Sequence, residues 1–287
     1  RQGRPLAARI AADQQWRFAT VARVPDKYRR ALLTFEDRRF EAHPGVDPLA
    51  VLRAARDNLA AGRVVSGGST LTMQLARLLR ADPPRTFPEK AREAVLALQL
   101  EWHLDKDEIL RQYASRAPFG GNTVGLRAAA WRYFQRPPEQ LSWAEAALLA
   151  VLPNSPALIH PGRDRERLRA KRDRLLETLR EQGALDRDDL TLARLEPLPR
   201  VQALPSLAPR LLDTLTAGGG APLLRTTLDA DLQRRVRDLA DHHGRRLGRQ
   251  GVHNLAVVVI DHRAMAVRAY LGNVNHGDPL TYGAAVD

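Results

Sequence analysis

The sequence contains no cysteine, which excludes disulfide bonds and metal sites built on thiolates. It also has no apolar run of roughly 18 residues, the least that a transmembrane helix needs. Its longest candidate, AEAALLAVLP at 144–153, is about half that length. Neither an initiating methionine nor a signal-peptide pattern stands at the start. We therefore expect a processed or truncated piece of a protein, or one whose membrane tether lies outside this sequence.

Aromatic residues and lysine are scarce. Phe, Trp and Tyr together make up 5% of the chain, which leaves few rings on which nucleic-acid bases could stack. The net charge of +12 still indicates anionic partners, such as phospholipid head groups or a diphosphate. Only four of the 45 basic residues are lysines, and the arginines alternate with acids in stretches such as 164–183, a pattern typical of solvated helix faces. We expect a globular protein that does not bind nucleic acid.

The eight histidines show no metal-binding spacing. No HExxH sequence is present, and the pair His242 and His243 falls in a charged helical stretch. We interpret these histidines as surface residues.

Residues 1–196 are predicted to be mainly helical. Asp47 followed by Pro48 has the pattern of a helix start, and Gly183 has that of a helix end. Hydrophobic periodicity predicts helices at residues 26–40, 48–59, 70–79, 88–103, 106–114, 122–135, 142–151 and 164–182.

The pattern changes after residue 196. Four prolines in 196–209 and the sequence AGGGAP at 217–222 indicate a linker, which we place at 197–222. Residues 223–287 are predicted to form a partial α/β segment with a helix and two strands joined by a tight turn at Asp261–Ala264. The residues expected on the packing side of that helix are Leu232, Val236 and Leu239.

A carboxylate lies on a packing face near the start. Glu36 follows Leu32 by four residues, so it shares the apolar stripe of that helix. One interpretation is a structural ion pair with Arg39, three residues further along the same face. The other is a catalytic acid or base whose pKa is raised by apolar surroundings.

The stretch GGSTLTMQLARLL at 67–79 places glycines and hydroxyl groups at a helix start. Free N–H groups and the positive end of the helix dipole suit such a position to phosphate. Thr70, Gln74 and Arg77 follow on one polar face and could hold the oxygens of a diphosphate. The alternative is a capped surface helix whose glycines serve only a turn.

A second carboxylate is Glu93, in a predicted helix that is apolar nearly all round. We expect such a helix to be buried. A stripe of Ala91, Ala94, Val95, Leu98 and Trp102 covers one side, and Glu93 shares the other side with Leu96, Ala97 and Leu100. A buried carboxylate must be paired, protonated or used. The available cations are Lys90 and Arg77.

Two such carboxylates with a phosphate-type helix start between them suit transfer of a sugar from a diphosphate carrier. One carboxylate would take the proton of an acceptor hydroxyl, while cations and helix N–H groups stabilise the departing diphosphate.

Five segments resemble, in order, the motifs of the glycosyltransferase domain of class A penicillin-binding proteins, which polymerises the peptidoglycan precursor lipid II. They are EDRRFEAHPGVD (36–47), GGSTLTMQLARLL (67–79), EKAREAVLALQLE (89–101), KDEILRQYASRAPFGGNTVGLRAAAWRYFQRP (106–137) and SWAEAALLAVLPNSP (142–156). The RAPFGG segment and Met73 resemble the corresponding positions of the penicillin-binding protein 1C branch of this family. The stretch from TTLDADLQ onward resembles the start of the transpeptidase domain, whose serine nucleophile would follow Asp287 and is not in this sequence.

The resemblance implies a mostly α, lysozyme-like domain at residues 1–196, held at the periplasmic face of the inner membrane by an N-terminal helix outside this sequence. It implies that Glu36 is the general base on the acceptor 4-hydroxyl, which attacks the anomeric carbon of a strand on undecaprenyl diphosphate with inversion. Glu93 would lie near the diphosphate and bind a divalent cation, Mg²⁺ or Mn²⁺. The residues lining the donor and acceptor subsites would be Asp37, Phe40, His43, Gly68, Ser69, Thr70, Gln74, Arg77 and Lys90. The expected partners are lipid II, the growing glycan strand and other cell-wall synthesis proteins.

Three positions depart from the family pattern. Met73 stands where a glutamine is usual, Ser115 where an asparagine is usual, and Glu89 replaces an arginine near the expected diphosphate site. Two alternatives to polymerisation stay open: a lysozyme-like hydrolase or lytic transglycosylase, and a non-catalytic scaffold that binds lipid II.

Overall fold

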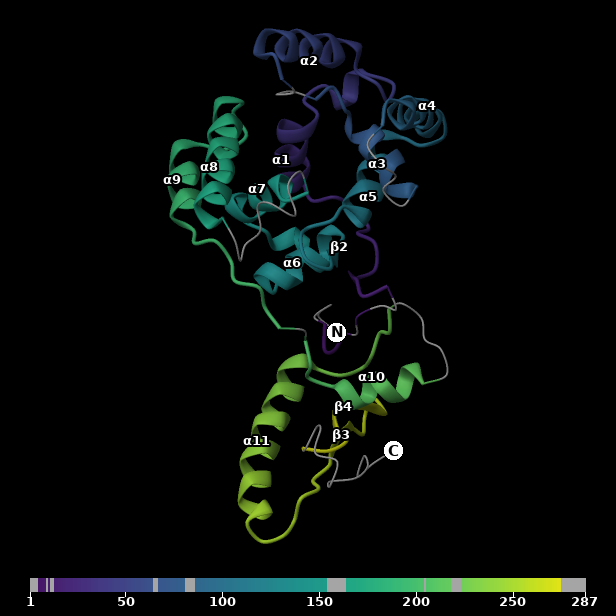
Figure 1. Ribbon diagram of the computed structural model, residues 1–287. Helices are drawn as coiled ribbons and strands as arrows, with labels where there is room; N and C mark the ends of the chain where they lie inside the picture. The colour runs from purple at the N-terminus through teal and green to yellow at the C-terminus, as the bar shows by residue number, and fades with distance from the viewer. Residues whose placement is uncertain are drawn as a thin grey trace. The chain divides into compact units, whose positions relative to one another are not determined.

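The computed structural model describes residues 5–8, 10, 13–63, 67–80, 86–153, 164–203, 205–217 and 223–274 (Figure 1). Contacts divide the chain into two compact units, one of Ala11–Gln202 and one of Arg1–Ile10 with Ala203–Asp287. Three predicted features reach beyond the described residues: most of the break at 217–222, the end of the fifth motif after Pro153, and the chain after residue 274.

The unit of residues 11–202 is built from α-helices, which confirms the predicted fold class. They are α1 (Asp26–Glu36), α2 (Pro48–Ala61), α3 (Leu71–Leu79), α4 (Phe87–His103), α5 (Lys106–Arg116), α6 (Leu126–Phe134), α7 (Trp143–Val151), α8 (Arg165–Glu181) and α9 (Arg187–Leu195). Short 3₁₀ turns η1 (Phe40–Ala42) and η2 (Pro138–Gln140) and a parallel pair of two-residue strands, β1 (Trp16–Arg17) and β2 (Thr123–Val124), complete the unit.

Helix α7 is the centre of this unit. Every residue from Ala144 to Val151 is buried, because a helix of alanine and leucine is apolar all round. Its start is closed by a capping box between Ser142 and Glu145, whose side chains each bond the other's backbone N–H. Helices α1, α6, α8 and α9 pack around it (Figure 1).

Helix α3 packs between α4 and α5 and carries the second sequence motif. Leu71 and Leu75 are buried as predicted, but Leu79 is half exposed, so the predicted packing side was wrong at that end. Helix α4 differs more: Val95, Leu98 and Trp102 are exposed, and the side with Glu93 and Ala97 is buried instead. The expectation of a fully buried helix was wrong.

Two predicted helices were too long at one end. The helix predicted for 26–40 ends at Glu36, because Asp37 leaves helical geometry and the chain re-forms only a 3₁₀ turn at Phe40. The helix predicted for 122–135 begins at Leu126, because Thr123 and Val124 pair with Trp16 and Arg17. Both differences arise from partners distant in sequence.

The second unit contains α10 (Pro209–Thr216), α11 (Ala230–Gly248) and the antiparallel strands β3 (Val257–Asp261) and β4 (Ala266–Leu271). The tight turn is found where it was predicted, with Asp261 accepting hydrogen bonds from the Arg263 and Ala264 N–H groups. Gln233 is fully buried on α11 and pairs with both backbone groups of Tyr270. Leu239, predicted to pack, is exposed. In the described stretches of both units, none of the helices has the length and apolarity needed to span a bilayer.

The loop after η1 lies tightly against α4. Gly45 has a φ of +98°, and a Cβ at this position would come within 2.6 Å of the Ala97 carbonyl oxygen. Its own carbonyl accepts a hydrogen bond from Thr70 Oγ1 at 2.5 Å. Glycine is therefore required here both by backbone conformation and by space.

We expect Gly45→Ala to lower the free energy of unfolding by about 2–4 kcal/mol, since it combines a left-handed backbone with a steric clash. The matched control is Gly62→Ala: Gly62 also has a positive φ, +60°, but a Cβ there meets nothing within 4 Å. This control should lose only about 1 kcal/mol. Denaturant unfolding followed by circular dichroism measures both, and equal losses would contradict the argument from space.

Candidate active site

The start of α3 is capped by the protein itself. Thr70 is the N-cap, and its Oγ1 accepts a hydrogen bond from the Met73 N–H at 3.1 Å. Asp37 Oδ2 accepts the Leu71 N–H at 3.0 Å. The N–H groups of Leu71 and Met73, which the sequence suggested could bind a phosphate, are thus bonded within the chain. A carboxylate of the first motif occupies the place expected for the ligand.

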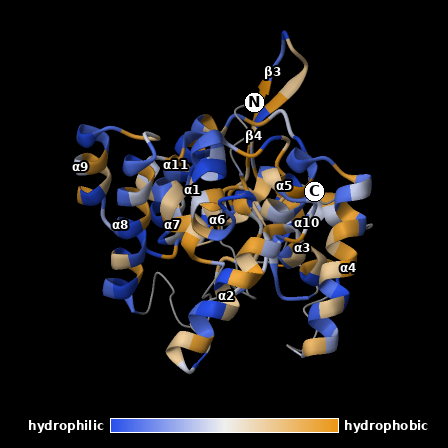
Figure 2. Ribbon diagram, turned by 90° about the horizontal axis from the view of Figure 1, so that it is seen from above, coloured by the Kyte–Doolittle hydropathy of each residue, from blue (hydrophilic) through white to orange (hydrophobic). Residues whose placement is uncertain are grey.

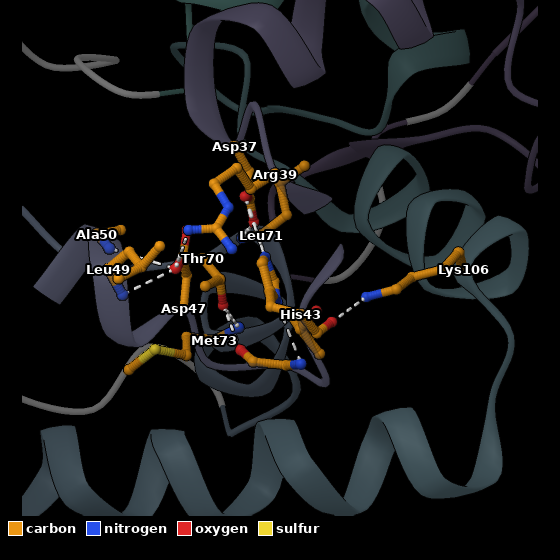
Figure 3. A network of polar contacts seen from close by, with 12 residues as sticks. Asp37, Arg39, His43, Asp47, Leu49, Ala50, Thr70, Leu71, Met73 and Lys106 are labelled. Atoms are coloured by element: carbon orange, nitrogen blue, oxygen red, sulfur yellow. Dashed lines mark hydrogen bonds and ion pairs between the residues drawn. The ribbon is translucent and has the colours of Figure 1, made fainter. Parts of the chain in front are cut away.

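Asp37 and His43 form a buried pair (Figure 3), so the interpretation of the histidines as surface residues was wrong for His43. His43 Nε2 lies 3.1 Å from both Asp37 oxygens, and His43 Nδ1 accepts the Gly45 N–H at 3.2 Å. The imidazole therefore carries its proton on Nε2 and donates it to Asp37. Both side chains, with the buried Phe40 beside His43, lie beneath the loop and hold it in place.

Glu36, the last residue of α1, is half-buried and faces α3. Gln74 Nε2 donates a hydrogen bond to Glu36 Oε2 over 2.8 Å. Arg39, the cation of the structural interpretation, forms its ion pair with Asp47 at 3.4 Å. This amide donor orients the Glu36 carboxylate and adds no positive charge to it.

Two buried tyrosines surround Glu36. Burial first, and the Glu36 charge second, raise the pKa of both Tyr28 and Tyr113 well above the usual value for a phenol. Both hydroxyls therefore stay protonated at neutral pH. The Tyr113 hydroxyl donates a hydrogen bond to Gln74 Oε1 at 3.1 Å.

Glu93 is the more deeply buried carboxylate, with 2% of its surface exposed. Arg77 Nη1 lies 3.2 Å from its Oε1, and Lys90 Nζ lies 2.8 Å from its Oε2. These are the two cations that the sequence analysis offered. Lys90 also donates to the Ser69 hydroxyl, and its side chain remains 44% exposed, so its ammonium group can reach a ligand in solution.

Helix α3 joins the two carboxylates. Gln74 and Arg77 are three residues apart, so their side chains neighbour each other on one helix face. Gln74 binds Glu36 from α1, and Arg77 binds Glu93 from α4. The structure thus links Glu36, Glu93, Gln74, Arg77, Lys90 and Ser69 through hydrogen bonds and ion pairs along α3. The other predicted site residues Asp37, Phe40, His43 and Thr70 are buried.

Gly68, the remaining predicted site residue, serves close packing. A Cβ on Gly68 would come within 2.8 Å of the Val51 Cα in α2. The glycine allows the loop before α3 to pass against that helix.

The side chains do not fit a metal site held by the protein. In the described ranges, there is no group of three or more His, Cys, Asp or Glu side chains that could bind an ion. Both oxygens of Glu93, the predicted ligand, are bonded to cations.

A second, partly buried network was not predicted from the sequence. Lys106 Nζ bonds Glu101 Oε1 and the His43 carbonyl oxygen, each at 2.7 Å, and lies 4.4 Å from the Phe40 ring centre. Glu101 also accepts from Thr72 Oγ1 at 2.7 Å. Helical spacing could have revealed Glu101, which follows Glu93 by eight residues on the same face. This network fixes the loop of the first motif to α3, α4 and α5.

The three departures from the family pattern are accommodated. Met73 is buried, where an apolar side chain fits. The Ser115 hydroxyl donates to the Arg111 carbonyl in its own helix at 2.7 Å. Glu89 lies between Arg80 and Arg92, and the hydrogen bond from Arg80 first, then that from Arg92, lowers the pKa of its carboxyl. The negative charge of Glu89 is thus paired with two cations.

Comparisons with known proteins identify the family of this chain. The family model described as transglycosylase matches residues 2–180. Penicillin-binding protein 1C of Escherichia coli is 46% identical over 98% of this chain and 36% of its own length. Penicillin-binding protein 1A of Aquifex aeolicus is 38% identical over 63% of this chain and 25% of its own length. The chain thus spans about a third or less of these relatives.

Among solved structures, the crystal structure of penicillin-binding protein 1A from Haemophilus influenzae matches 59% of this chain and 24% of its own, at 15% identity and a TM-score of 0.30. That score is too low to support an argument about the fold. The family is shown by the transglycosylase model, which matches more than half of the chain, together with the 46% identity over nearly all of it. This chain belongs to the transglycosylase family of the class A penicillin-binding proteins, as its five motifs predicted, and it is similar to penicillin-binding protein 1C, as the RAPFGG segment and Met73 predicted.

Proposed function

We propose that this chain is a peptidoglycan glycosyltransferase that polymerises lipid II into glycan strands. The observation that carries the proposal is that two carboxylates from different helices bond neighbouring side chains on one face of α3. Glu36 receives an amide hydrogen bond from Gln74, whereas Glu93 holds the cations Arg77 and Lys90. A base beside a cationic site is what sugar transfer from a diphosphate requires.

In this mechanism Glu36 accepts the proton of the acceptor sugar's 4-hydroxyl. The hydroxyl oxygen forms a bond to the anomeric carbon of the donor while the bond from that carbon to the diphosphate oxygen breaks, with inversion. Negative charge then grows on the diphosphate, which Arg77 and Lys90 stabilise. Glu93 holds these two cations in position before the substrate arrives.

Two alternatives fit the site less well. A hydrolase acting on finished glycan needs a general acid but has no use for the cation pair beside Glu93. A scaffold without activity would explain substitutions that damage the site, but Met73, Ser115 and Glu89 are each accommodated by their surroundings.

The site of action that we propose is the periplasmic face of the inner membrane. Helices α2 and α4 both present apolar side chains to solvent. Their apolar residues colour parts of both ribbons orange in Figure 2. These are Leu49, Val51, Leu52, Leu59, Phe87, Val95, Leu98 and Trp102. Such a surface suits contact with the bilayer that carries a lipid-linked donor. A membrane helix outside this sequence, the growing strand and other cell-wall synthesis proteins complete the proposal.

Replacement of the base tests the reaction directly. We expect Glu36→Gln to lower polymerisation of lipid II about 1,000-fold, because the amide cannot accept the proton. Glu41→Gln, which removes an exposed carboxylate five residues away, should keep the parent rate. Glycan polymer on a gel is the readout. Release of fragments from finished glycan by the parent chain, without polymer from lipid II, would instead establish the hydrolase.

The cationic side is tested by Lys90→Gln. Loss of the Lys90 ammonium group should lower kcat/KM for lipid II about 100-fold, since one charge that stabilises the departing diphosphate is removed. Arg92→Gln removes a cation two residues along the same helix that bonds Glu89 instead, and it should change the value less than about threefold. Equal losses in both variants would indicate a general effect of charge and not a diphosphate site.

The apolar surface is tested with phospholipid vesicles. Leu98→Ser with Trp102→Ser should weaken partitioning onto vesicles at least about tenfold, because burial of such side chains contributes about 1.5–3 kcal/mol each. Leu192→Ser with Leu195→Ser removes two exposed leucines from α9 and should leave partitioning unchanged. Sedimentation with vesicles measures both, and a larger loss in the α9 variant would refute the assignment to α4.

A further inference from the structure

Three side chains from three helices form a chain of hydrogen bonds that ends at Glu36. The Tyr113 hydroxyl of α5 bonds Gln74 Oε1 at 3.1 Å, and Gln74 Nε2 of α3 bonds Glu36 Oε2 at 2.8 Å. Tyr113 is 1% exposed and lies in the hydrophobic core, so it cannot itself contact a substrate. Its effect on the reaction must act through Gln74.

The direction of these bonds depends on which way the Gln74 amide faces. A glutamine amide turned by 180° would present its oxygen to Glu36, and two acceptors would then oppose each other. A carboxylate can only accept, so Gln74 must offer its NH₂ group to Glu36 and its oxygen to Tyr113. The hydroxyl satisfies this arrangement because it stays protonated and donates.

Packing alone does not account for the Tyr113 hydroxyl. A phenylalanine would fill almost the same space, and a buried hydroxyl stabilises a fold only when it finds a partner. Tyr28 offers a comparison within the same core. Its ring is also fully buried and its pKa also responds to Glu36, yet its hydroxyl has no hydrogen-bond partner among the described residues.

We propose that Tyr113 is a positioning residue for the base: its hydroxyl holds the Gln74 amide so that the NH₂ group, not the oxygen, faces Glu36. This inference rests on the proposed role of Glu36. Without the Tyr113 hydroxyl, the Gln74 amide is free to turn. In a fraction of the molecules Glu36 is then wrongly oriented for the 4-hydroxyl of the acceptor sugar. The acceptor and donor sites themselves are unchanged.

The test compares Tyr113→Phe with Tyr28→Phe, which removes a buried hydroxyl outside the chain of hydrogen bonds. We expect Tyr113→Phe to lower kcat for lipid II polymerisation about tenfold with KM within about twofold of the parent, and Tyr28→Phe to change neither. In a Gln74→Leu background, which has no amide to orient, Tyr113→Phe should cause no further loss. Equal effects of the two tyrosine variants, or losses that multiply in the double variant, would overturn the proposal.

A second measurement does not depend on activity. With glutamine labelled at the side-chain nitrogen, the NMR signal of the Gln74 amide, assigned by its disappearance in Gln74→Leu, should exchange slowly with solvent in the parent and in Tyr28→Phe. It should exchange faster in Tyr113→Phe. Unchanged exchange, or a Tyr113→Phe chain that does not fold, would show that the hydroxyl serves the core and not the amide.

Parent activity in Glu36→Gln would refute the proposed base, and the positioning role with it. An inactive Glu36→Gln beside a fully active Tyr113→Phe would refute only the positioning role. The same assay therefore separates the two failures.

Discussion

The hydrogen bond from the Leu71 N–H to Asp37 is the interaction on which the site depends. Asp37 follows Glu36 directly in the chain, and Leu71 is the first residue of α3. One bond of 3.0 Å therefore fixes the end of α1 against the start of the helix that carries Gln74 and Arg77. A carboxylate at a helix N-terminus is favoured both by the unsatisfied N–H groups and by the helix dipole. His43 holds that carboxylate from the other side and is itself held by the Gly45 N–H.

Around this anchor the two glutamates differ in their partners. Glu36 is half-buried and receives a neutral donor, while Glu93 is almost fully buried and receives two cations. Leaving a buried carboxylate without its cations costs free energy of folding. Arg77 and Lys90 therefore stay beside Glu93 whether or not a substrate is present. In the proposed reaction these environments suit separate tasks, with proton acceptance at Glu36 and placement of positive charge by Glu93.

The apolar surfaces of α2 and α4 show why burial could not be read from periodicity. Helix α4 has apolar residues on two sides, and the sequence indicates a buried helix for that reason. The side with Glu93, Ala97 and Glu101 is the one that packs, because its polar members find Arg77, Lys90, Thr72 and Lys106 on other elements. The purely apolar side, with Val95, Leu98 and Trp102, faces solvent. Burial of an apolar stripe away from water is favourable, and the partner that covers the stripe need not be another part of the same chain.

The sequence by itself determined the helical class, the positions of most helices, the two carboxylates on packing faces and Lys90 as a cation beside Glu93, because these follow from spacing within single helices. It also carried the family, through five motifs in order. Only the tertiary structure decided that Asp37 and His43 are buried as a pair and that Asp37 occupies the helix N-terminus expected for a phosphate. It alone decided that Arg39 pairs with Asp47 and that Tyr113 reaches Glu36 through Gln74. These contacts join residues from different helices and loops, and no periodicity encodes which side chain of one element will meet which side chain of another.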